Sequence, residues 1–216
     1  MPFRDLPGAK LVHYKKGDIL LASGEQLTHL FYLVEGVVNR EIVTENGNET
    51  IVSIKTNESP IDALVGVILL YRDSDISNST FVAKTDCTCY LIPKESYLEV
   101  ANKSPELLLD TIRLMTRETK RLTELYNSKR EGDAASRLCA LLLDQSRPKD
   151  GQTIVPAYWN NLEIAKYLGI HTVTVSRILK ILKQSGALKR SPQGLVLTDP
   201  AKIAAYAEHR EQLNYR

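Results

Sequence analysis

The sequence has little of what marks secreted, membrane-spanning or disulfide-bonded proteins. Its 216 residues include only three cysteines, an odd number, which argues against a disulfide framework. Its longest apolar run, Ile61–Tyr71, contains Asp62 and is too short to span a membrane. The first residues lack the apolar core of a signal peptide. We therefore expect a cytoplasmic protein that makes no contact with a membrane.

Patterns typical of enzymes and metal sites are also missing. The four histidines, His13, His29, His171 and His209, are scattered along the chain and show no spacing of metal ligands or of a catalytic triad. The chain also has no glycine-rich phosphate-binding loop. We predict no enzymatic activity, no metal site and no cofactor.

The charge is nearly balanced overall but not along the chain. The net charge is +2, from 28 Lys and Arg residues and 26 Asp and Glu residues. Residues 151–216 hold nine of the basic residues and four of the acidic ones, an excess of five positive charges, so residues 1–150 carry an excess of three negative charges. A basic C-terminal part suits a partner that presents phosphates.

Residues 160–183 predict two helices joined by a tight turn. Asn160 is a helix-capping residue with Glu163 three positions later, the spacing of a capping box. Gly169 can end the first helix in a left-handed conformation. The second helix has apolar residues at intervals of three and four positions, which predict one buried face. These are Val175, Ile178, Leu179 and Leu182.

The opposite face of the second helix has the chemistry of a DNA-recognition helix. Arginine can donate two hydrogen bonds to guanine, methyl groups can contact thymine, and lysine suits phosphates. The candidate DNA-contacting residues on this helix are Thr172, Val173, Thr174, Ser176, Arg177 and Lys180. The alternative is a plain helical hairpin with a solvated basic face.

The residues that follow favour DNA binding over the plain hairpin. Residues 187–197 predict a strand, a turn at Pro192 and Gly194, and a second strand. Such a wing would place Lys189 and Arg190 near the backbone of bound DNA. The prediction for this part of the chain is a winged helix-turn-helix.

The N-terminal half predicts a compact all-β unit. Short segments rich in β-branched and aromatic residues alternate with turn residues between positions 10 and 95, a pattern typical of a barrel or roll. Asn46-Gly47 is the strongest hairpin motif, because both residues tolerate a positive φ. The segment Thr50–Ile54 is the expected return strand.

A long helix is expected to follow the β unit. Ser104-Pro105-Glu106 combines a capping residue, a proline at the first position and an acid in the first turn. Running to about residue 128, the helix would be roughly 36 Å long at 1.5 Å per residue. Apolar residues spaced by three and four positions predict a dimer seam, although a helix packed on its own domain would show the same spacing. The seam residues are Leu108, Ile112, Met115, Thr119, Leu122 and Tyr126. The polar residues Ser128–Asp133 are expected to form a hinge.

These motifs together resemble the CRP/FNR (cyclic AMP receptor protein/fumarate-nitrate regulator) superfamily of bacterial transcription factors. The matching stretches are Lys16–Leu20, Leu30–Val38, Asn46-Gly47, Ala83–Cys87, Glu163–Ala165, Leu168-Gly169, Thr174–Leu179, Leu182, Gly194, Leu197 and Asp199.

The resemblance implies an α+β fold with three parts. It divides the chain into a β-roll sensor like a cyclic-nucleotide-binding domain (1–103), a dimerisation helix with a hinge (104–132) and a winged-helix DNA-binding domain (133–216). It implies a homodimer that binds double-stranded DNA at a near-palindromic operator under the control of a small-molecule effector, with RNA polymerase as a further candidate partner.

The nucleotide pocket is where the sequence departs from the superfamily. Members that bind cyclic nucleotides carry a Gly-Glu pair for the ribose and an arginine for the phosphate, whereas this chain has Ile61–Leu64 and Ser77-Asn78 at those places. Arg72 precedes the loop. We therefore predict no tight binding of cyclic AMP. The apolar stretch Ile61–Leu70 either fills the core or forms a pocket for a different effector. The candidate pocket residues are Asp62, Leu64, Ser77, Asn78, Thr119, Leu122 and Thr123.

Two further departures concern the DNA-binding helix. Many members have a glutamate where this chain has Val173, and a Ser or Thr helix cap where it has His171. Both predict an operator that differs from the superfamily's usual one.

The cysteines offer an alternative kind of regulation. Cys87 and Cys89 lie on one face of a predicted strand, since side chains alternate along a strand. They either pack in the core, as free cysteines commonly do, or make the protein a redox- or metal-responsive regulator of the same fold. An iron–sulfur cluster would need more cysteine ligands than this spacing offers.

Overall fold

The computed structural model describes residues 3–43, 47, 49–131 and 133–215, without the side chains of residues 121 and 124–131. The chain forms two compact units, Met1–Leu122 and Thr123–Arg216. The helices are η1 (Phe3–Asp5), η2 (Val67–Tyr71), α1 (Lys94–Ala101), α2 (Pro105–Glu131), α3 (Ala134–Asp144), α4 (Asn161–Leu168), α5 (Thr172–Gln184) and α6 (Pro200–Ala207). The strands are β1 (Lys10–Tyr14), β2 (Ile19–Leu21), β3 (His29–Glu35), β4 (Val38–Val43), β5 (Glu49–Lys55), β6 (Leu64–Val65), β7 (Thr80–Ala83), β8 (Cys87–Pro93), β9 (Arg147–Lys149), β10 (Gln152–Pro156), β11 (Leu188–Ser191) and β12 (Gly194–Leu197).

The first unit is the predicted β-roll. Its strands form two four-stranded antiparallel sheets, in the orders β1-β8-β3-β6 and β2-β7-β4-β5. In β5, β7 and the first part of β8 every second residue is buried, as the period of two predicts. Leu30, Val38, Phe81 and Cys89 all belong to one apolar core.

The predicted hairpin lies between β4 and β5. These strands pair antiparallel up to Val43 and Glu49, as such a hairpin requires. At its tip Gly47 has a φ of 75°, a left-handed conformation that favours glycine. Asn46 lies outside the described residues.

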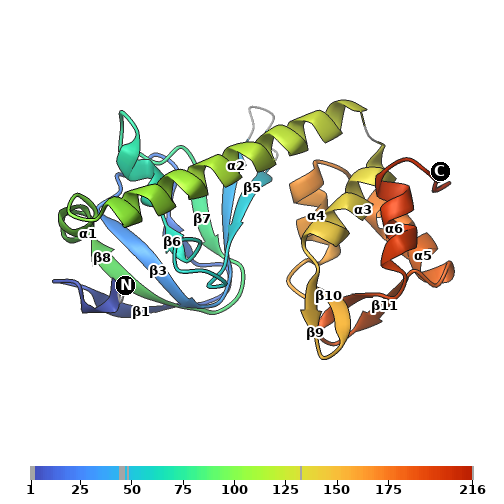
Figure 1. Cartoon of the computed structure of the whole chain (residues 1–216), viewed down its shortest axis with the longest axis horizontal. Helices are drawn as coiled ribbons and strands as arrows, with labels where there is room; N and C mark the ends of the chain where they lie inside the picture. Colours follow the sequence, from blue (N-terminus) through green and yellow to red (C-terminus); the bar gives the residue numbers. More distant parts are fainter. Residues whose placement is uncertain (1–2, 44–46, 48, 132, 216) are drawn as a thin grey trace. The chain divides into compact units, whose positions relative to one another are not determined.

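The long helix α2 begins where the capping motif predicts it. Ser104 Oγ accepts a hydrogen bond from the Leu107 amide, and the part of the helix that belongs to the first unit runs along the roll (Figure 1). Leu107, Thr111 and Leu114 are buried. The helix continues to Glu131, so residues 128–131 of the expected hinge are helical, and the hinge itself stays a prediction. Residue 132 lies outside the description, and Asp133 caps α3 through the Ser136 amide.

Within the described residues, the second unit holds the end of α2, the helices α3 to α6, and a four-stranded sheet in the order β11-β12-β10-β9. Arg147–Lys149 and Gln152–Pro156 pair as neighbouring antiparallel strands, β9 and β10. The sequence of β9, Arg-Pro-Lys, is polar and does not indicate a strand. Its proline is tolerated because β9 lies at the edge of the sheet. Trp159 is 2% exposed and packs edge-on against Tyr167 of α4, their ring centroids 5.2 Å apart.

Candidate nucleic-acid interface and effector pocket

The first helix of the helix-turn-helix begins and ends at the residues that the sequence predicts. The Asn160 side chain accepts hydrogen bonds from the amides of Leu162 and Glu163 and so caps α4. Gly169 ends α4 with a φ of 63°. The next helix, α5, begins after His171, whose side chain forms no capping hydrogen bond. The missing cap expected from the sequence is therefore confirmed, and the first amides of α5 receive no side-chain partner from His171.

The two faces of α5 differ as its spacing predicts. Val175, Ile178, Leu179 and Leu182 are buried. The side chains of the opposite face are exposed, except that Thr174 is half-buried. This outward face comprises Thr172, Val173, Thr174, Ser176, Arg177 and Lys180. Val173 is 59% exposed, an unusual amount for a valine in a folded domain.

The wing places two more cations at the surface. Lys189 and Arg190 are exposed on β11, which pairs with β12 through Arg190 and Leu195. Gly194 has a φ of 143°, and a side chain there would collide with the Val155 carbonyl oxygen. Within the described part of the chain, Arg177, Lys180, Lys189 and Arg190 form no ion pair, so their charges are available to phosphates.

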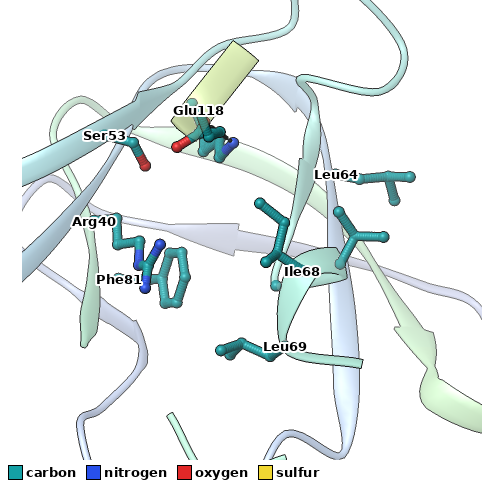
Figure 2. Close-up of a pocket in the computed structure, with 10 residues that line it drawn as sticks. Arg40, Ser53, Leu64, Ile68, Leu69, Phe81 and Glu118 are labelled. Carbon is teal, nitrogen blue, oxygen red and sulfur yellow. Dashed lines mark hydrogen bonds and ion pairs between the residues drawn. The ribbon is translucent and has the colours of Figure 1, made fainter. Parts of the chain in front are cut away.

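The β-roll contains a small cavity beneath α2 (Figure 2). Apolar residues of β6, η2 and β7 form most of its wall, and Ser53 of β5 and Arg40 of β4 lie at its polar side. Its volume is about 20 Å³, space for one or two water molecules. Pockets that hold drug-sized ligands measure roughly 300–1,000 Å³.

Two ion pairs attach α2 to the roll beside this cavity. Lys55 Nζ lies 2.7 Å from Glu118 Oε1, with side chains only 6% and 16% exposed. The neighbouring Arg117 pairs with Asp62 at 2.9 Å and is more exposed. Asp62 also accepts a short hydrogen bond from Ser59. Asp62, at the position where the superfamily binds the ribose, is thus already bound to partners within the protein.

The phosphate position is also occupied by internal partners. Asn78 Oδ1 accepts from Arg72 at 3.0 Å and from Arg40 at 3.4 Å, and Arg40 Nε donates to Ser79 Oγ at 2.8 Å. Burial lowers the pKa of the Arg40 guanidinium, an effect that Glu118 opposes and Arg72 strengthens. Arg40 belongs to β4. The pairing of β4 with β7 places it opposite Phe81 and so brings it close to Asn78 and Ser79.

The structure brings together only part of the predicted pocket. Leu64 lines the cavity. Ser77 is buried and donates to the Ser79 carbonyl. Thr119, Leu122 and Thr123 are exposed on α2 and are not among the residues that line the cavity.

The sequence interpretation missed the charged residues at this cavity, namely Arg40, Lys55 and Glu118. One pattern in the sequence points to Lys55. In β5 the buried positions are Ile51, Ser53 and Lys55, so the period of two places Lys55 on the inner face. A lysine there requires a partner, since an unpaired buried charge is costly.

The predicted dimer face of α2 is apolar and largely exposed. Ile112, Met115 and Leu122 are 57%, 38% and 43% exposed, and Leu109 is 52% exposed. Leu108 is half-buried against the core of the roll. The side chain of Tyr126 lies outside the described residues.

The three cysteines are free and buried. Burial raises the pKa of Cys89 and of Cys139 to about 12 and also raises that of Cys87. A thiol that stays protonated at neutral pH is a poor nucleophile and metal ligand.

Among the described residues no cluster of three or more His, Cys, Asp or Glu side chains is placed to hold a metal. No described helix is long and apolar enough to cross a membrane.

Sequence comparisons match both units. The family model of the cyclic nucleotide-binding domain matches residues 11–104, and that of the Crp-like helix-turn-helix domain matches residues 136–206. The fumarate and nitrate reduction regulatory protein of Salmonella typhimurium is 26% identical over 199 residues, covering 90% of this chain and 77% of its own. The cAMP-activated global transcriptional regulator CRP of the same species is 24% identical over 187 residues, 85% of this chain and 87% of its own.

Solved structures show the same fold. FixK2 from Bradyrhizobium japonicum superposes with a TM-score of 0.79 at 18% identity, covering 92% of this chain and 96% of that one. CooA from Carboxydothermus hydrogenoformans, a double mutant, gives 0.74 at 20% identity, covering 92% and 88%. The relatives are transcription regulators rather than enzymes. With its β-roll and Crp-like helix-turn-helix, the chain belongs to the CRP/FNR family of transcriptional regulators.

Proposed function

We propose that the protein acts as a homodimer on a near-palindromic operator in double-stranded DNA. The observation that carries this proposal is the outward face of α5, where Ser, Thr, Arg and Lys side chains stand exposed around one valine. Two copies of α5 would enter successive major grooves about 34 Å apart. The exposed apolar face of α2, from Leu109 to Leu122, supports dimerisation, because a single chain leaves it in contact with water.

Each side chain of the DNA-binding face has a proposed role. Arg177 and Ser176 contact base edges, assisted by Thr172 and Thr174, and the Val173 methyls contact a thymine methyl. Lys180, Lys189 and Arg190 contact phosphates, which add affinity without sequence information. A surface of RNA polymerase is a further proposed partner of the DNA-bound protein.

DNA selection tests this proposal. Full-length protein is incubated with a library of random duplexes, and the bound fraction is sequenced. We expect an enriched near-palindrome, bound with an affinity that falls steeply with salt because phosphate contacts release counterions. A helix-turn-helix that serves protein contacts instead would enrich no sequence and would show a flat salt dependence.

The proposed effector is a small molecule other than cyclic AMP. Asp62 is paired with Arg117, Arg40 and Arg72 share Asn78, and the cavity holds about 20 Å³. A cyclic nucleotide would have to displace these contacts and open the space between the roll and α2. We expect no heat of binding when cyclic AMP is titrated into the protein in a calorimeter. Submicromolar binding would refute this part of the proposal.

A further inference from the structure

Asn161 and Ser176 connect the first turn of α4 to the outward face of α5. Asn161 Nδ2 donates a hydrogen bond to Ser176 Oγ over 2.8 Å. Ser176 is exposed. Across the described residues, this is the single hydrogen bond of the Ser176 side chain, so its hydroxyl hydrogen has no acceptor within the protein.

The direction of this hydrogen bond decides what Ser176 offers to DNA. A serine hydroxyl has one hydrogen to donate and lone pairs to accept with. Because Asn161 occupies one of the two lone pairs and leaves the hydroxyl hydrogen unused, this hydrogen is free to turn outward, together with the second lone pair. In the major groove it can meet guanine O6 or N7, adenine N7 or thymine O4, but the cytosine N4 amino group is itself a donor.

A second observation narrows this choice to thymine. Val173 lies one turn before Ser176 on the same face and is 59% exposed. Thymine is the base that presents both an acceptor, O4, and a methyl group in the major groove. A hydroxyl donor beside an exposed aliphatic side chain matches that pair of groups.

We infer that Asn161 is a positioning residue that sets Ser176 as a hydrogen-bond donor, and that Ser176 and Val173 together thereby select thymine in the operator. The inference rests on the proposed placement of α5 in the major groove. Asn161 itself acts through Ser176 and needs no contact with a base.

Modified bases separate the two contributions. In the duplex enriched from the random library, one thymine at a time is replaced by uracil, which lacks the methyl, or one T·A pair at a time is replaced by 5-methylcytosine paired with guanine, which keeps the methyl but carries an amino group in place of O4. At the thymine read by this pair, 5-methylcytosine should weaken wild-type binding roughly fivefold, the effect of about one hydrogen bond. Asn161→Ala and Ser176→Ala should each abolish that difference. The penalty for uracil should persist in Asn161→Ala and disappear in Val173→Ala.

An isosteric change of Asn161 tests the direction of the hydrogen bond. In Asn161→Asp the carboxylate accepts from the Ser176 hydroxyl, which turns a lone pair of Oγ toward the DNA. Affinity for every duplex should fall because of the added negative charge, yet the ratio between the two bases should invert in favour of 5-methylcytosine. Leu162→Ala, the exposed neighbour in the same turn, should leave the ratio unchanged.

The outcomes distinguish this inference from the proposed function. If wild type and Asn161→Ala show the same ratio of affinity for thymine over 5-methylcytosine, the role of Asn161 is overturned. It is also overturned if Ser176→Ala changes the base preference at no position of the operator. Sequence-specific binding would then stand without it. A library that yields no enriched sequence overturns the proposed DNA recognition and this inference with it.

Discussion

The helix-turn-helix and the β-roll use their charged side chains in opposite ways. On α5 and the wing, Arg177, Lys180 and Arg190 are exposed. Beside the cavity of the roll, Lys55 and Asp62 pair with residues of α2. In the second unit the predicted DNA-contacting face is open to partners, whereas in the first unit the positions at which the superfamily binds a cyclic nucleotide are occupied by contacts within the protein. Family membership is therefore a better guide to what the helix-turn-helix binds than to what the β-roll senses.

Breaking the buried ion pair should have the largest effect on the roll. Glu118→Ala leaves Lys55 buried without its counter-charge, which costs about 3–5 kcal/mol of unfolding free energy. Chemical denaturation followed by circular dichroism measures it. Glu99→Ala is the matched control, because it breaks an exposed pair with Lys103 at 3.0 Å, and such pairs contribute about 0–1 kcal/mol. Equal losses in the two variants would contradict the importance of the buried pair.

Substitutions on the exposed face of α5 should weaken DNA binding without lowering the stability of the fold. Arg177→Ala is expected to weaken operator binding by about 1–3 kcal/mol and to relax one base preference. Lys180→Ala should instead weaken all duplexes alike and lower the salt slope by about 1. Fluorescence anisotropy with labelled duplexes at several salt concentrations distinguishes them. Unchanged affinity after Arg177→Ala would refute its assignment to base contacts.

The missing cap on α5 is a place where the DNA-binding unit can be stabilised. His171→Ser supplies an oxygen acceptor for the first amides of α5 and should stabilise the unit by about 1 kcal/mol relative to His171→Ala. Differential scanning calorimetry would record a transition at a higher temperature for the serine variant. Identical transitions in both variants would mean that these amides already have adequate partners.

The smallest effect is expected from the cysteines of the roll. The reactive form of a thiol is the thiolate, and the raised pKa of Cys89, about 12, leaves this form scarce at pH 7–8. Alkylation of the native protein should therefore be slow at pH 8 and accelerate as the pH rises. Operator affinity should be the same in the Cys87→Ser/Cys89→Ser variant as in wild type under reducing and oxidising conditions. A redox-dependent affinity that this variant loses would support the alternative of a redox sensor.

The sequence predicted best the features that local residues determine. The Asn160 cap, the Gly169 stop and the buried face of α5 depend on neighbours within two turns of helix, and the strands of the roll follow from a period of two. These patterns specify the fold class and the outward face of α5.

The features that sequence reasoning missed depend on distant partners. Arg40 reaches Asn78 because β4 pairs with β7, and Lys55 meets Glu118 63 positions later in the chain. The bond from Asn161 to Ser176 likewise depends on how α4 packs against α5. The period of two places Lys55 on the inner face of β5, but no local pattern identifies the partners in these contacts.

The packing of Trp159 gives the DNA-binding unit a spectroscopic reporter of its own. It is the one tryptophan of the chain, it is buried, and its indole N–H has no hydrogen-bond partner among the described residues. Its intrinsic emission should lie at short wavelength in the native state and shift to the red when this unit unfolds. Excitation of tryptophan therefore follows the output half of the regulator alone, while the β-roll contributes no tryptophan emission.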